Sequence, residues 1–132
     1  MNYIIAYLAV IVPLGLLDAL WILVLGKGFY AKHMGFLFTS PVNYAPIAFF
    51  YPIYALVVLV LVVMPAVSAG SFVQALGYGA LLGLAAYGAY DLTNHATIAN
   101  WPVVMTVVDM AWGMVVTALT SVIAYFLISS LR

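Results

Sequence analysis

Four long apolar stretches, separated by short polar breaks, cover almost the whole chain. They run over about residues 3–25, 42–64, 72–96 and 102–131. A helix that crosses the hydrocarbon core of a bilayer needs about 20 mostly apolar residues, and each stretch is that long. The pattern therefore predicts an all-α membrane protein. We expect a compact bundle of four transmembrane helices, a single transmembrane domain over residues 1–132, with both termini on the same side.

The breaks between the stretches contain residues that end or begin helices. The run Gly-Lys-Gly at residues 26–28 follows the first stretch, since glycine tolerates a turn and lysine is costly in hydrocarbon. Pro41 and Pro102 stand at helix starts, where a missing backbone N–H costs nothing. Residues 26–41 form the longest break, and their aromatic and basic residues favour the membrane–water interface. We therefore predict an interfacial loop at residues 26–41.

Composition supports a lipid environment and excludes several classes of function. Hydrophobic residues make up 69% of the chain and charged residues 5%, whereas soluble domains average about 25% charged. A chain with this few charged residues cannot cover a water-facing surface. The lipid bilayer is therefore the expected partner. The net charge is zero and no basic run occurs, so a nucleic-acid partner is not expected. The chain has no cysteine, which excludes disulfides and thiolate nucleophiles.

All three acidic residues are aspartates within predicted helices: Asp18, Asp91 and Asp109. An aspartate near the bilayer centre costs about 2.5–3.5 kcal/mol on insertion scales, so it is a functional candidate by default. At about 1.5 Å rise per residue, helices running in alternate directions bring the three to one depth, in the half nearer residues 26–41. We expect them to face the bundle interior in one polar pocket. Because burial and mutual repulsion favour the neutral acid, we expect at least one, Asp91 first, to be protonated when the pocket is empty.

Further polar and aromatic residues are predicted at the same level. The third helix carries four polar residues at i, i+4, i+7 and i+8, which share one face. The first and fourth helices share the pattern D-x-x-W, in LLDALWIL and VVDMAWGM, which places each tryptophan on the face of its aspartate. The second helix adds an amide and a hydroxyl. The candidates for the binding pocket are thus Asp18, Trp21, Asn43, Tyr51, Tyr87, Asp91, Asn94, His95, Asp109 and Trp112.

Metal and cofactor sites have little support in the sequence. Asp91 and His95, at i and i+4, are the pair that could chelate a metal, but a single intramembrane histidine without cysteine is a sparse ligand set. No metal is therefore expected. Nucleophile-elbow, HExxH, P-loop and haem-type motifs are absent from the sequence, so no cofactor is expected either.

A stripe of small residues marks a close contact on the third helix. Ala75, Gly79 and Gly83 are spaced four apart, a small-xxx-small pattern that lets helices approach closely. A transport path through four helices would need a second copy of the chain. We therefore take this stripe as the candidate surface for a homo-oligomer.

Several motifs together resemble a known family. The run YGAYDLTNHATIANWPVVMTVVDMAWG, with LLDALWI, GFY and FYPIYAL, resembles the bacterial membrane-protein family catalogued as domain of unknown function 2177. The resemblance covers nearly the whole chain and implies a compact multi-helix protein of the bacterial cytoplasmic (inner) membrane. It implies no activity, cofactor or catalytic residue. Lys27 and Lys32 against Arg132 predict, by the positive-inside rule, that residues 26–41 face the cytoplasm.

Three functions remain open at this point. The first is binding or transport of a small polar or cationic solute, with the carboxyls exchanging protons. The second is a membrane-embedded enzyme that acts on a lipid or fatty acyl substrate, with aspartate and histidine as acid and base. The third is an accessory subunit without chemistry of its own.

Overall fold

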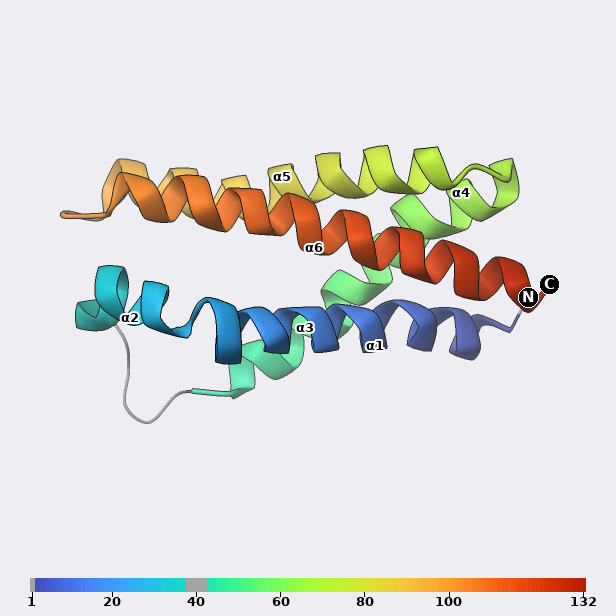
Figure 1. Cartoon of the computed structure of the whole chain (residues 1–132), viewed down its shortest axis with the longest axis horizontal. Coiled ribbons are helices and arrows are strands. Elements are labelled where there is room, and N and C mark those ends of the chain that lie inside the picture. Colours follow the sequence, from blue (N-terminus) through green and yellow to red (C-terminus); the bar gives the residue numbers. More distant parts are fainter. Residues whose placement is uncertain (1, 38–42) are drawn as a thin grey trace.

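The computed structural model describes residues 2–37 and 43–132, which are helical along most of their length (Figure 1). No β-strand occurs in this described part of the chain. The elements are, in order, α1 (Tyr3–Leu20), the π turn η1 (Trp21–Leu25), α2 (Lys27–Met34), the 3-10 turn η2 (Gly35–Leu37), α3 (Ala45–Val58), the π turn η3 (Leu59–Val63), α4 (Met64–Ala69), α5 (Phe72–Thr97) and α6 (Val103–Ser130).

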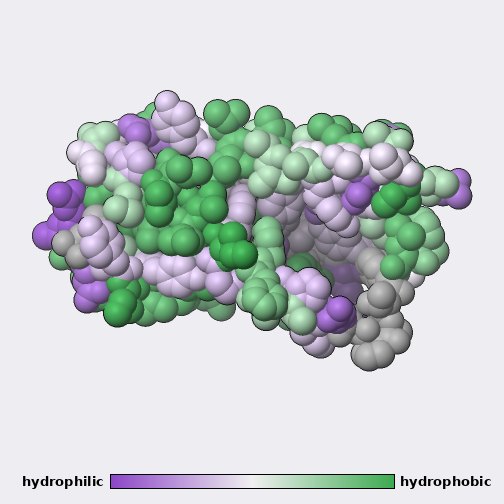
Figure 2. All heavy atoms as spheres, turned by 180° about the vertical axis from the view of Figure 1, so that it is seen from behind, coloured by the Kyte–Doolittle hydropathy of each residue, from purple (hydrophilic) through white to green (hydrophobic). Residues whose placement is uncertain are grey.

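Helical segments of membrane-spanning length account for nearly all of the described chain. Four are long and apolar enough to cross a bilayer: Tyr3–Val24, Ala45–Ala69, Phe72–Thr97 and Val103–Ser130. Large apolar side chains cover much of the exterior, as a lipid-facing surface requires (Figure 2). The predicted all-α bundle of four transmembrane helices is therefore confirmed.

The breaks between the spans differ in part from the prediction. Residues 27–34, expected within a loop, form the helix α2, and Lys32 in its last turn suits the negative end of the helix dipole. The second span continues through Pro65, which takes a first-turn position of α4, and ends at Gly70 with a left-handed φ of 66°. The predicted start of this span at Pro41 and Val42 lies outside the described residues.

The helix α6 lies between α5 and α1 and contacts both (Figure 1). The continuous segment α3–η3–α4 crosses the bundle diagonally: α3 contacts α1, whereas α4 contacts α5 and α6. The face in Figure 2 shows a hollow in the half of the molecule nearer α2, with hydrophilic atoms among those that line it.

The small-residue stripe on α5 packs within the chain. A Cβ on Gly79 would lie 2.8 Å from Ser121 Oγ and 3.0 Å from Ala118 Cα, both on α6, and a Cβ on Gly83 would overlap the backbone of Gly113. The prediction that this stripe joins two copies is therefore wrong for this surface, because α6 of the same chain already covers it. Spacing alone shows that a close contact occurs and does not show with which helix.

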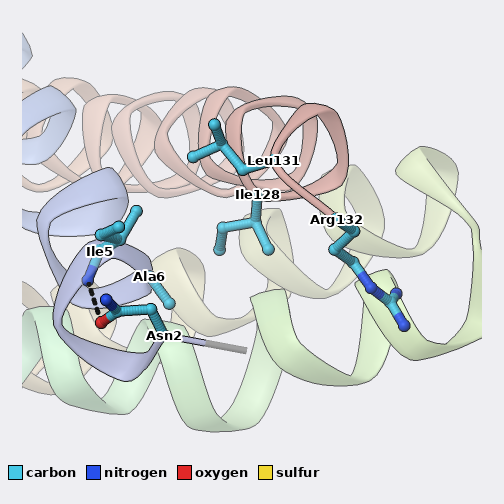
Figure 3. A pocket seen from close by; sticks show the side chains of 6 residues that line it. All are labelled: Asn2, Ile5, Ala6, Ile128, Leu131 and Arg132. Carbon is cyan, nitrogen blue, oxygen red and sulfur yellow. Dashed lines mark hydrogen bonds between the residues drawn. The ribbon is translucent and has the colours of Figure 1, made fainter.

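Both ends of the described chain meet at one end of the bundle, opposite α2 (Figure 1). There a pocket of about 540 Å³ lies between α1 and the end of α6; its lining residues are Asn2, Ile5, Ala6, Ile128, Leu131 and Arg132 (Figure 3). Arg132 donates from Nη1 to the carbonyl of Val67, 3.3 Å away. This pocket is separate from the aspartates, which lie in the other half.

Candidate functional site

Asp18 is a buried carboxylate with a hydrogen-bond donor at each oxygen. It lies in the last turn of α1 and is 7% exposed. Trp112 on α6 donates from Nε1 to Oδ1 over 2.9 Å, and the hydroxyl of Tyr51 on α3 donates to Oδ2. Hydrogen bonds from α3 and α6 therefore hold this side chain in place from two helices besides its own.

Asp109 on α6 is held from the other direction, by the short helix α2. The hydroxyl of Tyr30 donates to Asp109 Oδ1 over 2.7 Å, and the same hydroxyl accepts a 2.7 Å hydrogen bond from Trp21 Nε1. Met34 of α2 packs with Trp101 in a second small core, which holds α2 against the bundle. Tyr30 is not among the residues predicted for the site, because it lies in the predicted interfacial loop, where aromatic residues are common.

The two D-x-x-W patterns meet through their tryptophans. The rings of Trp21 and Trp112 stack with centroids 4.5 Å apart and planes 8° from parallel. Trp112 donates to the aspartate of α1, and Trp21 reaches the aspartate of α6 through the hydroxyl of Tyr30. The tryptophan of each pattern therefore contacts the aspartate of the other pattern, either directly or through Tyr30. These contacts hold α1 and α6 together.

Asp91 on α5 differs from the other two aspartates. It is 0% exposed, and neither carboxyl oxygen has a hydrogen-bond partner within the described residues. The acidic group that faces it is the carboxyl of Asp109. A carboxyl buried without a donor is stable only as the neutral acid or beside a cation. As the acid, Asp91 could donate to Asp109, and the two are called the carboxyl pair below.

Tyrosines line the space around these carboxyls. Tyr87 lies directly over Gly113, where a Cβ would overlap its ring, and its ring meets Tyr54 edge-on at 6.5 Å. Tyr54 shares a 2.8 Å hydrogen bond with Thr117 on α6. Tyr87 is near both Asp18 and Asp109.

Other predicted residues lie outside this network. His95 Nδ1 lies 3.1 Å from Thr106 Oγ1, which also accepts from Trp101 Nε1 over 3.0 Å. Asn43 is exposed, and its side chain accepts from the backbone N–H of Ala45 at the start of α3. Asn94 is half-buried on α5, without a hydrogen bond to the carboxyls. In the described part of the chain, no group of three His or Asp side chains is placed to hold a metal.

Replacement of Tyr30 by phenylalanine should release α2 from the bundle. Burial raises the pKa of Tyr30, so its hydroxyl stays protonated and donates to Asp109 at any ordinary pH. Tyr30→Phe removes this donor and leaves Trp21 Nε1 without its acceptor, at a cost of about 1–3 kcal/mol. Hydrogen–deuterium exchange of residues 27–34 in detergent micelles should accelerate by about tenfold.

The matched control is Tyr78→Phe, since Tyr78 is 56% exposed on α5. This variant should exchange like the wild type throughout. Equal exchange of residues 27–34 in wild type and Tyr30→Phe would show that the tyrosine hydroxyl does not hold α2.

Residues 3–126, a span that includes all three aspartates, match the model of one protein family, described as "Predicted membrane protein (DUF2177)". No curated protein and no solved structure matches the chain. The family match agrees with the resemblance carried by the YDLTN, W-P and D-x-x-W motifs, and the family description names no ligand or reaction. The chain therefore belongs to the membrane-protein family of domain of unknown function 2177, and it is an integral membrane protein.

Proposed function

We propose that this protein binds a small polar or cationic solute inside the membrane, at the carboxyl pair of Asp91 and Asp109, in exchange for a proton. The observation that carries the proposal is the environment of Asp91. Its side chain is fully buried, and neither carboxyl oxygen has a hydrogen-bond donor within the described residues. An unpaired buried carboxyl costs free energy that a purely structural role would not repay. Such a group supports a role in which its partner comes and goes.

The carboxyl pair has the chemistry for exchange. Two facing carboxylates in a low dielectric cannot both be ionised without a cation between them, whereas one shared proton joins them by a hydrogen bond. A bound cation can take the place of that proton. Tyr30 donates to Asp109 in either state and so keeps this carboxyl in position.

The enzyme alternative has less support from the geometry. An acid–base mechanism of the predicted kind would pair an aspartate with His95, but the Nδ1 of His95 is engaged with Thr106. Asp18 and Asp109 make their hydrogen bonds to tyrosine and tryptophan. Solute binding therefore has the better support from the hydrogen bonds of the site.

For its setting, we propose the bacterial inner membrane with α2 on the cytoplasmic side. The support is the family resemblance together with Lys27 and Lys32, which are both exposed on α2 and so are free to face the negative leaflet.

Infrared spectroscopy of the empty protein tests the shared proton. The wild type should show a protonated-carboxyl band near neutral pH, shifted by ¹³C-labelling of aspartate. Asp91→Asn should lose the band, since its amide can donate to an ionised Asp109. A wild type without the band, or a band that survives both Asp91→Asn and Asp109→Asn, would refute the proposal.

A further inference from the structure

We infer, resting on the proposed function, that the solute taken by the Asp91–Asp109 pair is a small, singly charged organic ammonium ion. Such an ion presents N–H donors and a positive charge to the ionised carboxyl oxygens, which only accept hydrogen bonds. Aromatic rings surround these oxygens. The inference follows from three properties of the site: the hydrogen bonds that the carboxyls lack, the charge around them, and the chemistry of the walls.

The hydrogen-bonding pattern calls for a ligand that donates. Asp91 receives no hydrogen bond within the described residues, and Asp109 receives its bond from Tyr30 at Oδ1. Ionised carboxyl oxygens only accept, and an alkylammonium group carries up to three N–H donors. One ammonium group could therefore satisfy oxygens of both carboxyls, which a solute with acceptors alone could not do.

The charge around the pair limits the ligand to one positive charge per proton released. The protein's own cations are elsewhere: Lys27 and Lys32 are exposed on α2, and Arg132 is bonded to Val67 at the opposite end. A pair that holds one shared proton exchanges it for one monovalent cation without a change in the charge of the buried site. A buried site favours such an exchange, because a change of net charge in low dielectric is costly.

The walls of the site are aromatic. Tyr30 contacts Asp109, Tyr87 is near Asp109 and Asp18, and Tyr90 is near both members of the pair. Aromatic faces attract organic cations. Hard metal ions instead take six or more oxygen ligands, which two carboxyls and a few hydroxyls do not provide. The carboxyl and hydroxyl oxygens of the site, with the aromatic rings around them, therefore fit an ammonium ion better than a metal ion.

Other titratable groups lie around the carboxyls, and variants of the pair distinguish it from them. These groups are Asp18 from α1, Tyr30 from α2, Tyr51 and Tyr54 from α3, and Tyr87, Tyr90 and His95 from α5. Asp18 accepts hydrogen bonds from Trp112 and Tyr51, and His95 Nδ1 lies beside Thr106. Proton release that comes from the pair itself should therefore disappear in Asp91→Asn and in Asp109→Asn.

Calorimetry in two buffers of different ionisation enthalpy measures both binding and proton release. The protein is held in nanodiscs of uncharged lipid near neutral pH, and the probes are ethylammonium, sodium and magnesium chlorides. Ethylammonium should bind with release of about one proton, and the metal ions should not compete at equal concentration. Asp91→Asn and, independently, Asp109→Asn should weaken ethylammonium binding at least tenfold and remove the proton release. Thr93→Ala, at an exposed position of α5, should bind like the wild type.

The outcomes separate this inference from the proposed function. If magnesium or sodium binds with a proton release that Asp91→Asn abolishes, and ethylammonium does not compete, then the ammonium inference is overturned while cation binding at the pair stands. If no probe binds to a wild type that melts cooperatively, the ammonium inference is overturned. The proposed function then depends on whether the wild type shows the protonated-carboxyl band in the infrared spectrum. If ethylammonium binds equally to Asp91→Asn and Asp109→Asn, the site lies elsewhere and the inference is again overturned.

Discussion

A single methyl group added at Gly83 is expected to force α5 away from α6. The new Cβ would overlap the backbone carbonyl of Gly113 and would lie 2.9 Å from Thr117 Oγ1. A backbone group cannot rotate aside as a flexible side chain can, so the two helices must separate locally. Overpacking of this kind costs about 1–3 kcal/mol, and the lost contacts along the helix pair add to it. Gly83→Ala should therefore lower the free energy of unfolding by at least about 2 kcal/mol.

The matched control is Gly77→Ala on the same helix. A Cβ there meets no atom within 4 Å, and alanine is the better helix former by about 1 kcal/mol. Unfolding by SDS titration of detergent-solubilised protein should give a clearly lower midpoint for Gly83→Ala and an unchanged or higher midpoint for Gly77→Ala. Equal midpoints for the two variants would mean that α5 and α6 are further apart than the structure has them.

The spans could be predicted from the sequence because a helix in lipid must satisfy its own backbone. Each apolar run therefore indicates one helix, whichever neighbours that helix packs against. The short helix α2 could not be predicted in this way, since what holds it is the contact of Tyr30 and Met34 with residues more than 60 positions away. The second span continues beyond its predicted end at residue 64, because Pro65 fits the first turn of α4, where a missing backbone N–H costs little.

The burial of the three aspartates could also be predicted, because a charge in hydrocarbon turns to the interior. Their partners could not. Which donor meets which oxygen depends on how each helix is rotated and where it crosses its neighbours. The D-x-x-W spacing predicts that Trp21 and Trp112 lie on the faces of their own aspartates. In the structure Trp112 donates to Asp18, and Trp21 reaches Asp109 through the hydroxyl of Tyr30. For the same reason, the predicted site residues Asn43 and His95 do not reach the carboxyls. Asn43 lies at the start of α3, and His95 lies beside Thr106.

The pattern of donors gives the three aspartates two different roles, which one replacement can separate. Asp18 accepts from Trp112 and Tyr51, so its carboxylate joins α1 to α6 and α3. An asparagine at this position keeps one acceptor oxygen for Trp112 and turns an NH₂ group towards Tyr51, whose hydroxyl can accept from it but then has no acceptor for its own hydrogen. Hydrogen bonds to a charged group are worth about 1.5–3 kcal/mol. We therefore expect Asp18→Asn to lower the free energy of unfolding by about 2 kcal/mol.

Asp91→Asn, the same replacement on α5, should have almost no effect on stability. No donor points at this carboxyl in the described residues, so none is stranded, and the new amide can donate to Asp109 as the neutral acid would. The change in the free energy of unfolding should stay below about 0.5 kcal/mol, the size typical of harmless substitutions. Thermal and SDS unfolding of the two variants beside the wild type make the comparison. A loss for Asp91→Asn as large as that for Asp18→Asn would mean that Asp91 is itself a structural anchor, and the exchange of its partner would lose its basis.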